Sequence, residues 1–514
     1  MRGIFVIAIV VAFMALSAAV SADDGGTSAQ FQKWKDDVIA AIKRGDRQQA
    51  LQLVRPRADQ GDAAAEIVLG LFYENGEAVA KDYEQAALWY RKAAEQGDAD
   101  GEYYLGALYH AGHGVAQDDQ QALSWYHKAA DQGHASAQND LGAMYAHGQG
   151  VPRDYAQAVA WYRKAADQGD AEAELNLGIS YDVGEGVPLD QSQAVTWFRK
   201  AADQHVVQAE LLLGLACGGG MGVPLDYAQA LVWLHKAAGQ GNATAQYFIG
   251  MMYTGGQGVP RDYTQALVWF HEAADQHYPD AEDAIGHMYE YGQGVRRDYG
   301  QAARWFRQAA DQGHAQAEFD LGTLYGDGHG VRRDYGQALL WYRKAADQDY
   351  ASAQNNLGFM YESGRGVKQD YGLALSWYRK AAEQGDDTAE TNLGAMYFDG
   401  HGVPRDYGQA AMWFRKAADQ HYPMAEYNLG VMYENGDGVR RNHGQAAIWY
   451  RAAARDGEVK ANQALADLTR ARRTYTMRRA ASSQDASQGA SFFACHYLLS
   501  GPPFIAGMSG CPPW

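Results

Sequence analysis

The sequence has few cysteines and no excess of positive charge, and each shortage excludes a class of protein. Its 514 residues include three cysteines, Cys217, Cys495 and Cys511. Three cysteines are too few for a disulfide framework, and they lack the Cys-x-x-Cys spacing of a zinc site. The formal net charge is −18. Because nucleic-acid binding depends on cations that neutralise phosphates, we do not expect this acidic chain to bind DNA or RNA.

Long apolar runs are also scarce, and the one present lies at the start of the chain. Residues 4–20 are apolar, follow a short basic end and precede the small residues of a cleavage site. This layout predicts a cleaved secretory signal over residues 1–22, so that the mature chain is periplasmic or secreted. The alternative is that residues 4–20 remain as a membrane anchor, because the run is close to spanning length.

A strict internal repeat is what the sequence has in abundance. Eleven of the 13 tryptophans recur every 36 residues, from Trp89 to Trp449. The stretch HGVPRDYGQAAMWFRKAADQH at 401–421 returns as HGVRRDYGQALLWYRKAADQD at 329–349. A fixed period of this length indicates a solenoid of stacked units, here eleven units over residues 62–457.

Each unit is predicted to contain two helices, as residues 386–421 illustrate. Apolar residues recur at helical spacing in the first half of the unit, and Gly400 and Gly402 end that helix. Asp406 starts the second helix, where Asp-x-x-Gln is a capping box. The expected buried face of the second helix consists of Ala410, Trp413, Phe414 and Ala417.

A glycine inside every first helix needs an explanation, because a helical glycine costs about 1 kcal/mol relative to alanine. We interpret it as a point of close approach between helices, where the large tryptophan needs a small neighbour. These glycines are Gly70, Gly106, Gly142, Gly178, Gly214, Gly250, Gly286, Gly322, Gly358, Gly394 and Gly430.

The pattern A-x-x-x-L-G-x-M-Y-x-x-G-x-G-V-x-x-D-Y-x-x-A-x-x-W-Y-x-K-A-A-x-Q-G resembles the Sel-one-like repeat family, a relative of the tetratricopeptide solenoids. The resemblance implies an all-α fold, a right-handed α/α superhelical solenoid of eleven 36-residue helix pairs with terminal caps and a concave groove lined by first helices. It also implies a non-catalytic scaffold or adaptor for protein–protein interaction, often exported in bacteria. A cysteine-rich branch has been linked to β-lactam binding, but these repeats lack its paired cysteines.

The ends of the chain depart from the repeat. Residues 23–61 are expected to form an N-terminal helical cap, and residues 458–480 a C-terminal capping helix, because terminal units must bury one side and expose the other. Residues 481–514 are expected to be a low-complexity linker followed by an apolar tail. Cys495 and Cys511 in that tail would pair in an oxidising compartment, and the alternative is an unstructured tail.

Common catalytic motifs are missing: there is no Ser-x-x-Lys, Gly-x-Ser-x-Gly, His-Glu-x-x-His or Gly-x-x-x-x-Gly-Lys. His110 and His113 precede Asp118 and Asp119, a spacing that suggests a metal site. The position of His113, however, holds Gln, Glu, Met, Arg or Asp in other units, which is typical of an exposed loop. We therefore expect no enzyme, no metal site and no cofactor.

One variable position on the first helices is the candidate binding site. Buried positions are fixed between units, so a position that varies faces solvent or a partner. Because an amide both donates and accepts hydrogen bonds, a row of such side chains predicts binding to the backbone of an extended peptide. The alternative is that each side chain bonds to the adjacent repeat. This amide stripe consists of Asp140, Asn176, Asp320, Asn356, Asn392 and Asn428.

The sequence as a whole favours an exported scaffold that binds protein or an extended peptide in the groove. The alternative is a peptidoglycan binder or a modulator of a wall-acting enzyme, which exposed aromatic residues in the groove would favour. Contact with a membrane is expected only if the N-terminal segment stays uncleaved. In the other five units the stripe position holds Val68, Tyr104, Leu212, Phe248 and Ala284. These side chains and the aromatic residues one position earlier either supply pockets or pack between units, the latter being Tyr103, Tyr247, Phe319 and Tyr427.

Overall fold

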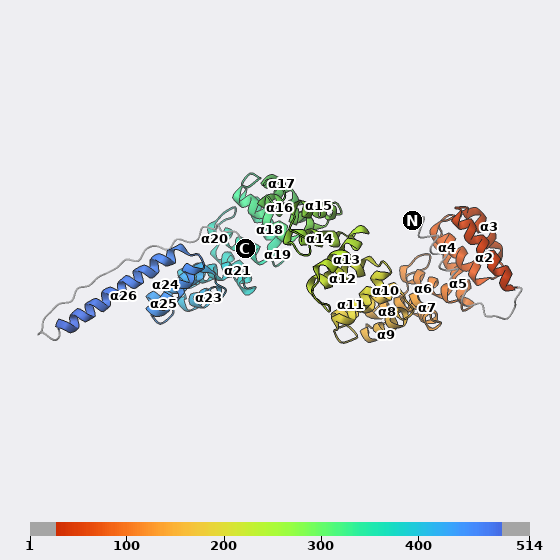
Figure 1. Cartoon of the computed structure of the whole chain (residues 1–514), viewed down its shortest axis with the longest axis horizontal. Coiled ribbons are helices and arrows are strands. Elements are labelled where there is room, and N and C mark those ends of the chain that lie inside the picture. Colours follow the sequence, from red (N-terminus) through yellow and green to blue (C-terminus); the bar gives the residue numbers. More distant parts are fainter. Residues whose placement is uncertain (1–26, 486–514) are drawn as a thin grey trace. The chain divides into compact units, whose positions relative to one another are not determined.

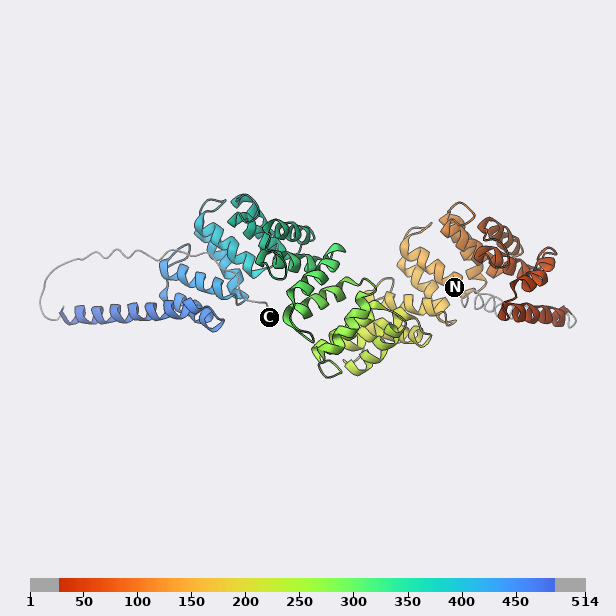
Figure 2. The ribbon, with the colours of Figure 1, turned by 90° about the horizontal axis from the view of Figure 1, so that it is seen from above.

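The computed structural model describes residues 27–485, and all 25 elements in that range are helices. The chain divides into two compact units, Met1–Trp305 and Phe306–Trp514, and within each unit successive helix pairs pack in chain order (Figures 1 and 2). The fold is therefore an all-α solenoid, as expected. The expected signal over residues 1–22 and the cysteines Cys495 and Cys511 lie outside the described residues.

Eleven helix pairs follow one another along the chain. The first helices of the pairs are α4 (Ala63–Asn75), α6 (Ala99–Ala111), α8 (Ala135–His147), α10 (Ala171–Val183), α12 (Val207–Gly219), α14 (Ala243–Gly255), α16 (Pro279–Tyr291), α18 (Ala315–Asp327), α20 (Ala351–Ser363), α22 (Asp387–Asp399) and α24 (Pro423–Asn435). The second helices are α5 (Tyr83–Glu95), α7 (Asp119–Asp131), α9 (Tyr155–Ala166), α11 (Gln191–Asp203), α13 (Tyr227–Gly239), α15 (Tyr263–Ala274), α17 (Tyr299–Asp311), α19 (Tyr335–Asp347), α21 (Tyr371–Glu383), α23 (Tyr407–Asp419) and α25 (His443–Arg455).

Three further helices flank the pairs. They are α2 (Thr27–Lys43) and α3 (Arg47–Ala58) on the N-terminal side and α26 (Val459–Asp485) on the C-terminal side. The last helix runs five residues past the boundary expected at residue 480, so the start of the predicted linker is helical. Within residues 27–485, none of the helices combines the length and the apolar character needed to cross a lipid bilayer.

Caps satisfy both ends of the helices in a pair, but only half of the predicted capping box forms, because the N–H of Asp406 donates to the carbonyl of Tyr397 at 2.9 Å and not to the side chain of Gln409. Asp406 is the N-cap of α23, and its Oδ1 accepts the backbone N–H groups of Gly408 at 2.9 Å and Gln409 at 3.0 Å. Gly400 ends α22 in the left-handed conformation, with φ at 76°, and its N–H donates to the carbonyl of Met396. These bonds satisfy backbone groups that a helix end leaves without partners.

Replacing Asp406 with alanine should lower the free energy of unfolding by about 1 kcal/mol, because the side chain that accepts two backbone N–H groups is lost. A denaturant melt followed by circular dichroism would measure the change. Asp406→Asn is the matched control, since Asn442 makes the same two bonds at the start of α25. Equal destabilisation by both substitutions would show that the cap is not the cause.

The glycine inside each first helix is a point of close approach, but its neighbour is not the tryptophan. A Cβ atom at Gly394 would lie 2.8 Å from Cδ1 of Phe414, the residue after Trp413. The same holds for Gly358 and Tyr378, at 2.7 Å. Successive residues of a helix point about 100° apart, so only one of the two aromatic rings can face the first helix of its own pair. The prediction that the tryptophan needs this small neighbour was therefore wrong.

The tryptophans instead pack against the preceding repeat. Trp413 on α23 belongs to a buried cluster whose other members lie on α19 to α22, and Trp161 on α9 joins a cluster of α7 and α8. A lysine three residues later covers the ring, with Nζ of Lys416 at 4.3 Å from the ring centre of Trp413. The expected buried face of the second helix is thus confirmed, and it joins repeats as well as the two helices of one pair.

A second glycine, present in ten of the eleven loops and replaced by Ala78 in the first, makes a contact between repeats that sequence analysis missed. Gly402 has φ at 71°, and a Cβ atom there would lie 2.6 Å from the carbonyl oxygen of Tyr371, at the start of the preceding second helix. The imidazole of the neighbouring His401 stacks on the Tyr371 ring, with centroids 4.5 Å apart. Only glycine lets the loop approach the backbone of its neighbour so closely.

Candidate functional site

The amide stripe lies on first helices, as predicted. Asp140 and Asn176 are on α8 and α10, and Asp320, Asn356, Asn392 and Asn428 are on α18, α20, α22 and α24. Five of the six side chains are half-buried, whereas Asn428 is 6% exposed. Neighbouring first helices contact each other, for example α8 with α10 and α20 with α22. A molecule lying across them would therefore meet successive members of the stripe.

Two members of the stripe bond to the adjacent repeat through asparagines that sequence analysis did not single out. Nδ2 of Asn176 donates to Oδ1 of Asn139 at 2.9 Å, and Nδ2 of Asn139 donates to Oδ1 of Asp140 at 3.2 Å. The same chain of bonds runs from Asn392 through Asn355 to Asn356, with lengths of 2.9 and 3.4 Å. The bridging alternative thus describes Asn176 and Asn392. Adjacent polar pairs, Asn139-Asp140 and Asn355-Asn356, were the signal in the sequence.

The carboxylates of the stripe also have partners within the protein. Asp140 is hydrogen-bonded to the side chains of Asn139 and Tyr103, and burial raises the pKa of its carboxyl. Oδ2 of Asp320 accepts Nε2 of Gln316 at 2.9 Å. Because an asparagine amide offers two donors and an acceptor oxygen with two lone pairs, single internal bonds leave capacity for a ligand. Peptide binding by the stripe stays a prediction.

The aromatic residues that precede the stripe pack against neighbouring rings. Tyr247 lies 5.7 Å from Phe270 of its own pair and 5.5 Å from Tyr278 at the start of the next, measured between centroids. Burial raises the pKa of Tyr247 to about 12. Tyr427 packs on Tyr450 of its own pair. The interpretation that these rings pack between units is confirmed for Tyr103, Tyr247 and Phe319, whereas the ring contact of Tyr427 lies within its own pair. Tyr103 contacts His134 at the start of the next unit. Phe319 contacts Tyr342 of its own pair and Tyr350 at the start of the next unit.

A buried polar pair inside most repeats was missed by sequence analysis. Oε2 of Glu66 accepts Nε2 of Gln96 at 2.7 Å, which links the first helix of the pair to the C-terminal end of the second. Burial raises the pKa of Glu66 and its bond with Gln96 opposes that shift. The 30-residue spacing of the two positions recurs along the chain. The same bond joins Glu102–Gln132, Gln138–Gln168, Glu174–Gln204, Glu210–Gln240, Gln246–Gln276, Glu318–Gln348, Gln354–Gln384 and Glu390–Gln420.

The histidines and aspartates of the suspected metal motif do not gather in one place. Nδ1 of His110 lies 2.8 Å from Oδ1 of Asp119, an ion pair when the imidazole is protonated. Asp118 caps α7, and His113 is exposed and stacks on Tyr83 of the preceding repeat. The four residues therefore serve helix ends and contacts between repeats.

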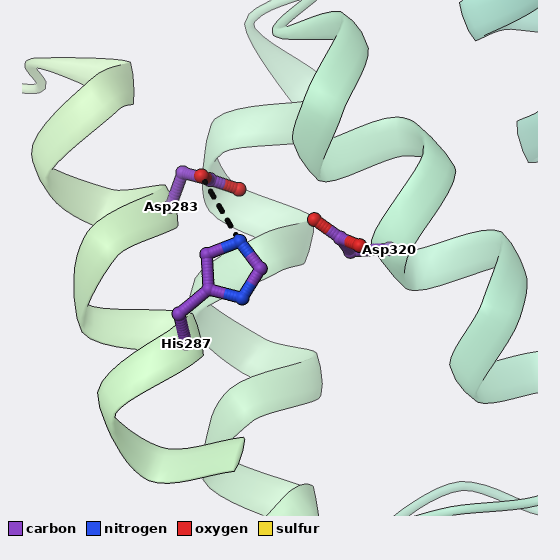
Figure 3. Close-up of side chains that lie close together, drawn as sticks. All are labelled: Asp283, His287 and Asp320. Atoms are coloured by element: carbon purple, nitrogen blue, oxygen red, sulfur yellow. Dashed lines mark ion pairs between the residues drawn. The ribbon is translucent and has the colours of Figure 1, made fainter. Parts of the chain in front are cut away.

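His287 on α16 is a further histidine beside acidic groups. Its Nε2 lies 3.5 Å from Oδ2 of Asp283, one helical turn earlier (Figure 3). Its Nδ1 lies 3.3 Å from Oε2 of Glu290. Side chains three and four residues apart share one face of a helix, so these pairs support α16 when the imidazole is protonated.

Comparison with known proteins gives a consistent result. A family model described as Sel1 repeat matches eleven consecutive stretches from residue 63 to residue 458. A protective antigen of uropathogenic Escherichia coli with an SLR fold is 35% identical, with 87% of this chain and 99% of that chain covered and a TM-score of 0.65. A Sel1 repeat protein from Oxalobacter formigenes is 36% identical, with 60% and 89% covered and a TM-score of 0.47. No curated protein matches the chain.

Solenoids of this type generally mediate protein–protein interaction and are typically non-catalytic. The 36-residue period, the helix pairs of the structure and the family model agree over the same part of the sequence. The chain belongs to the Sel1 repeat family.

Proposed function

We propose that this protein is an exported, non-catalytic scaffold that binds a protein or an extended peptide along its first helices. The observation that supports the proposal best is the amide stripe, whose polar side chains, five of the six half-buried, occupy one position of α8 and α10 and again of α18, α20, α22 and α24. Export is proposed from residues 1–22, and an anchor over residues 4–20 remains the alternative.

The spacing of the stripe suits an extended peptide. Packed helices lie about 8–10 Å apart, and an extended chain advances about 3.3 Å per residue. Successive stripe side chains would therefore meet about every third residue of a bound peptide. Their amides would bond its backbone groups, so the site would tolerate a range of side chains.

Peptidoglycan binding, or the control of a wall-acting enzyme, is the alternative with less support. Sugar rings are usually held by exposed aromatic side chains. Tyr247, Phe319 and Tyr427, each one residue before the stripe position of its helix, are instead packed against neighbouring rings. For this reason we place peptide binding first.

Replacing Asn356, Asn392 and Asn428 together with alanine should weaken partner binding at least tenfold, because three adjacent repeats lose their backbone-bonding groups. The full-length protein would first capture partners from an envelope extract. The affinity of a purified partner would then be measured by isothermal titration calorimetry against the parent and the triple variant.

Two controls distinguish the loss of contacts with the partner from the loss of order between repeats. Met412→Ala with Ile448→Ala changes exposed residues on the second helices and should leave binding unchanged. Asn355→Ala removes the hydrogen bond to Asn392 but keeps the stripe, so it reports on order between repeats. If the triple variant melts like the parent and binds the partner equally well, the stripe is not the binding site.

A further inference from the structure

The last repeat breaks the buried polar pair that recurs in the other repeats. Where the C-terminal end of the second helix elsewhere carries glutamine, α25 is followed by Asp456. Its counterpart on the first helix, Glu426 on α24, is 1% exposed. A buried carboxyl therefore faces a second carboxyl instead of an amide donor, and two carboxylates repel each other unless a proton or a cation lies between them.

A histidine completes this cluster. His421 precedes α24, and its Nδ1 lies 3.9 Å from Oε1 of Glu426 and 3.7 Å from Oδ2 of Asp456. One ligand atom from each of the three residues lies within 4.8 Å of the others. Oε2 of Glu426 is buried and has no hydrogen-bond donor. Burial raises the pKa of the Glu426 carboxyl, and a bond between it and Asp456 requires a proton on one of them.

Arg455 compensates part of this negative charge but does not supply the missing donor. Its Nε and Nη2 each lie 2.7 Å from an oxygen of Asp456, and these bonds lower the pKa of that carboxyl. The arginine side chain is largely exposed, so it can swing into solvent when another cation takes its place. Nη2 also lies 3.4 Å from Nδ1 of His421, which shows that a cation already occupies this side of the cluster.

We propose that His421, Glu426 and Asp456 bind a divalent cation of the zinc class. One imidazole nitrogen and two carboxylate oxygens form a three-ligand set that zinc accepts, with water in the fourth position. Tetrahedral bonds of 2.0–2.2 Å would place ligand atoms about 3.4 Å apart. The two separations from Nδ1 of His421, 3.9 and 3.7 Å, therefore need to close by about half an ångström at most. Calcium and magnesium fit less well, because they favour all-oxygen sets.

The chain contains a natural comparison for this site. His205 lies before α12, and its Nδ1 is 3.9 Å from Oε1 of Glu210, as His421 is from Glu426. There, however, Nε2 of Gln240 donates to Oε2 of Glu210 at 2.8 Å. The two sites thus differ in their third residue, which is Gln240 beside Glu210 and Asp456 beside Glu426. The amide of Gln240 is neutral and already donates to the glutamate, so it offers no negative charge to a cation.

The test measures zinc binding to the full-length protein by isothermal titration calorimetry, with bound zinc counted by elemental analysis. The parent should bind one tight equivalent. Asp456→Gln, which restores the glutamine of the other repeats, should lose that equivalent. His421→Gly, which introduces the residue most repeats have there, should weaken it at least tenfold. Gln240→Asp should gain a second equivalent, because it copies the last repeat onto His205 and Glu210.

A second readout does not depend on counting ions. Zinc should raise the melting temperature of the parent and leave that of Asp456→Gln unchanged, because only the parent gains a folded-state ligand. Without zinc, Asp456→Gln should melt above the parent, since the buried glutamate regains a donor. The proposal fails if the parent and Asp456→Gln bind the same number of ions with the same affinity, which would assign binding to the other histidines.

Discussion

Replacing Trp341 with alanine is expected to lower the free energy of unfolding by about 3–5 kcal/mol, the largest effect we expect from a single side chain. The indole is 4% exposed. Nζ of Lys344 lies 3.9 Å from its ring centre, and the Arg307 guanidinium of the preceding repeat lies at 5.6 Å. The substitution therefore removes a large apolar side chain and two cation–π contacts at once.

The position of the tryptophan between repeats decides how the loss should appear. The stability of a solenoid is approximately a sum of repeat terms and terms for neighbouring interfaces. Trp413, at the same repeat position as Trp341, packs into a cluster that includes the preceding repeats. Trp341→Ala should therefore weaken the interface between two repeats more than it weakens the packing inside one repeat. A guanidinium melt followed by circular dichroism should show a lower midpoint and a broader or divided transition.

Two neighbouring changes serve as controls for Trp341→Ala. Leu340 is 47% exposed, and Leu340→Ala should change stability by no more than about 0.5 kcal/mol. Trp341→Phe should lower the free energy of unfolding much less than Trp341→Ala does. The indole Nε1 is buried without a hydrogen-bond partner, so phenylalanine loses no hydrogen bond and retains most of the ring packing. A melt of Trp341→Ala that matches the parent would contradict a core position for the tryptophan.

Much of the fold could be predicted because its determinants are local and repeated. Asp406 caps the second helix through residues two and three positions later, and Gly400 ends the first helix through a bond four residues back. Such signals lie within one turn of helix and recur every 36 residues. A single sequence therefore contains several copies of the same observation.

Contacts between helices were harder to predict because neighbouring residues on one helix compete for them. Trp413 and Phe414 are both large and apolar, and sequence spacing alone could not assign one of them to Gly394. The register between helices assigns Phe414. The same limit applies to Asn355, whose role depends on reaching Asn392 on the next first helix, 37 residues later.

Asp456 shows what a departure from the period can mean. The change from glutamine to aspartate is visible when the repeats are aligned, yet its consequence depends on Glu426, 30 residues earlier and on another helix. The sequence alone does not show that the glutamate is buried or that His421 lies beside it. Burial turns an ordinary surface substitution into a carboxyl pair that needs a proton or a cation.

Replacing Gly358 with alanine is expected to destabilise the protein by about 1–3 kcal/mol, although alanine favours helices over glycine by about 1 kcal/mol. The added Cβ atom would lie 2.7 Å from Cδ1 of Tyr378. The ring cannot move away easily, because Tyr378 is fully buried and its hydroxyl donates to Oε2 of Glu362 at 2.6 Å. Steric overlap should therefore outweigh helix propensity.

Gly239→Ala is the matched control for Gly358→Ala. Gly239 is the last residue of α13, is exposed, and has no atom within 4 Å of a Cβ added there, so alanine should be neutral or stabilising by up to about 1 kcal/mol. Denaturant melts of the two variants should thus move in opposite directions from the parent. If Gly358→Ala is as stable as Gly239→Ala, close packing does not explain the helical glycine. The recurrence of that glycine in every repeat would then need a reason outside the pair, such as contact with a bound partner.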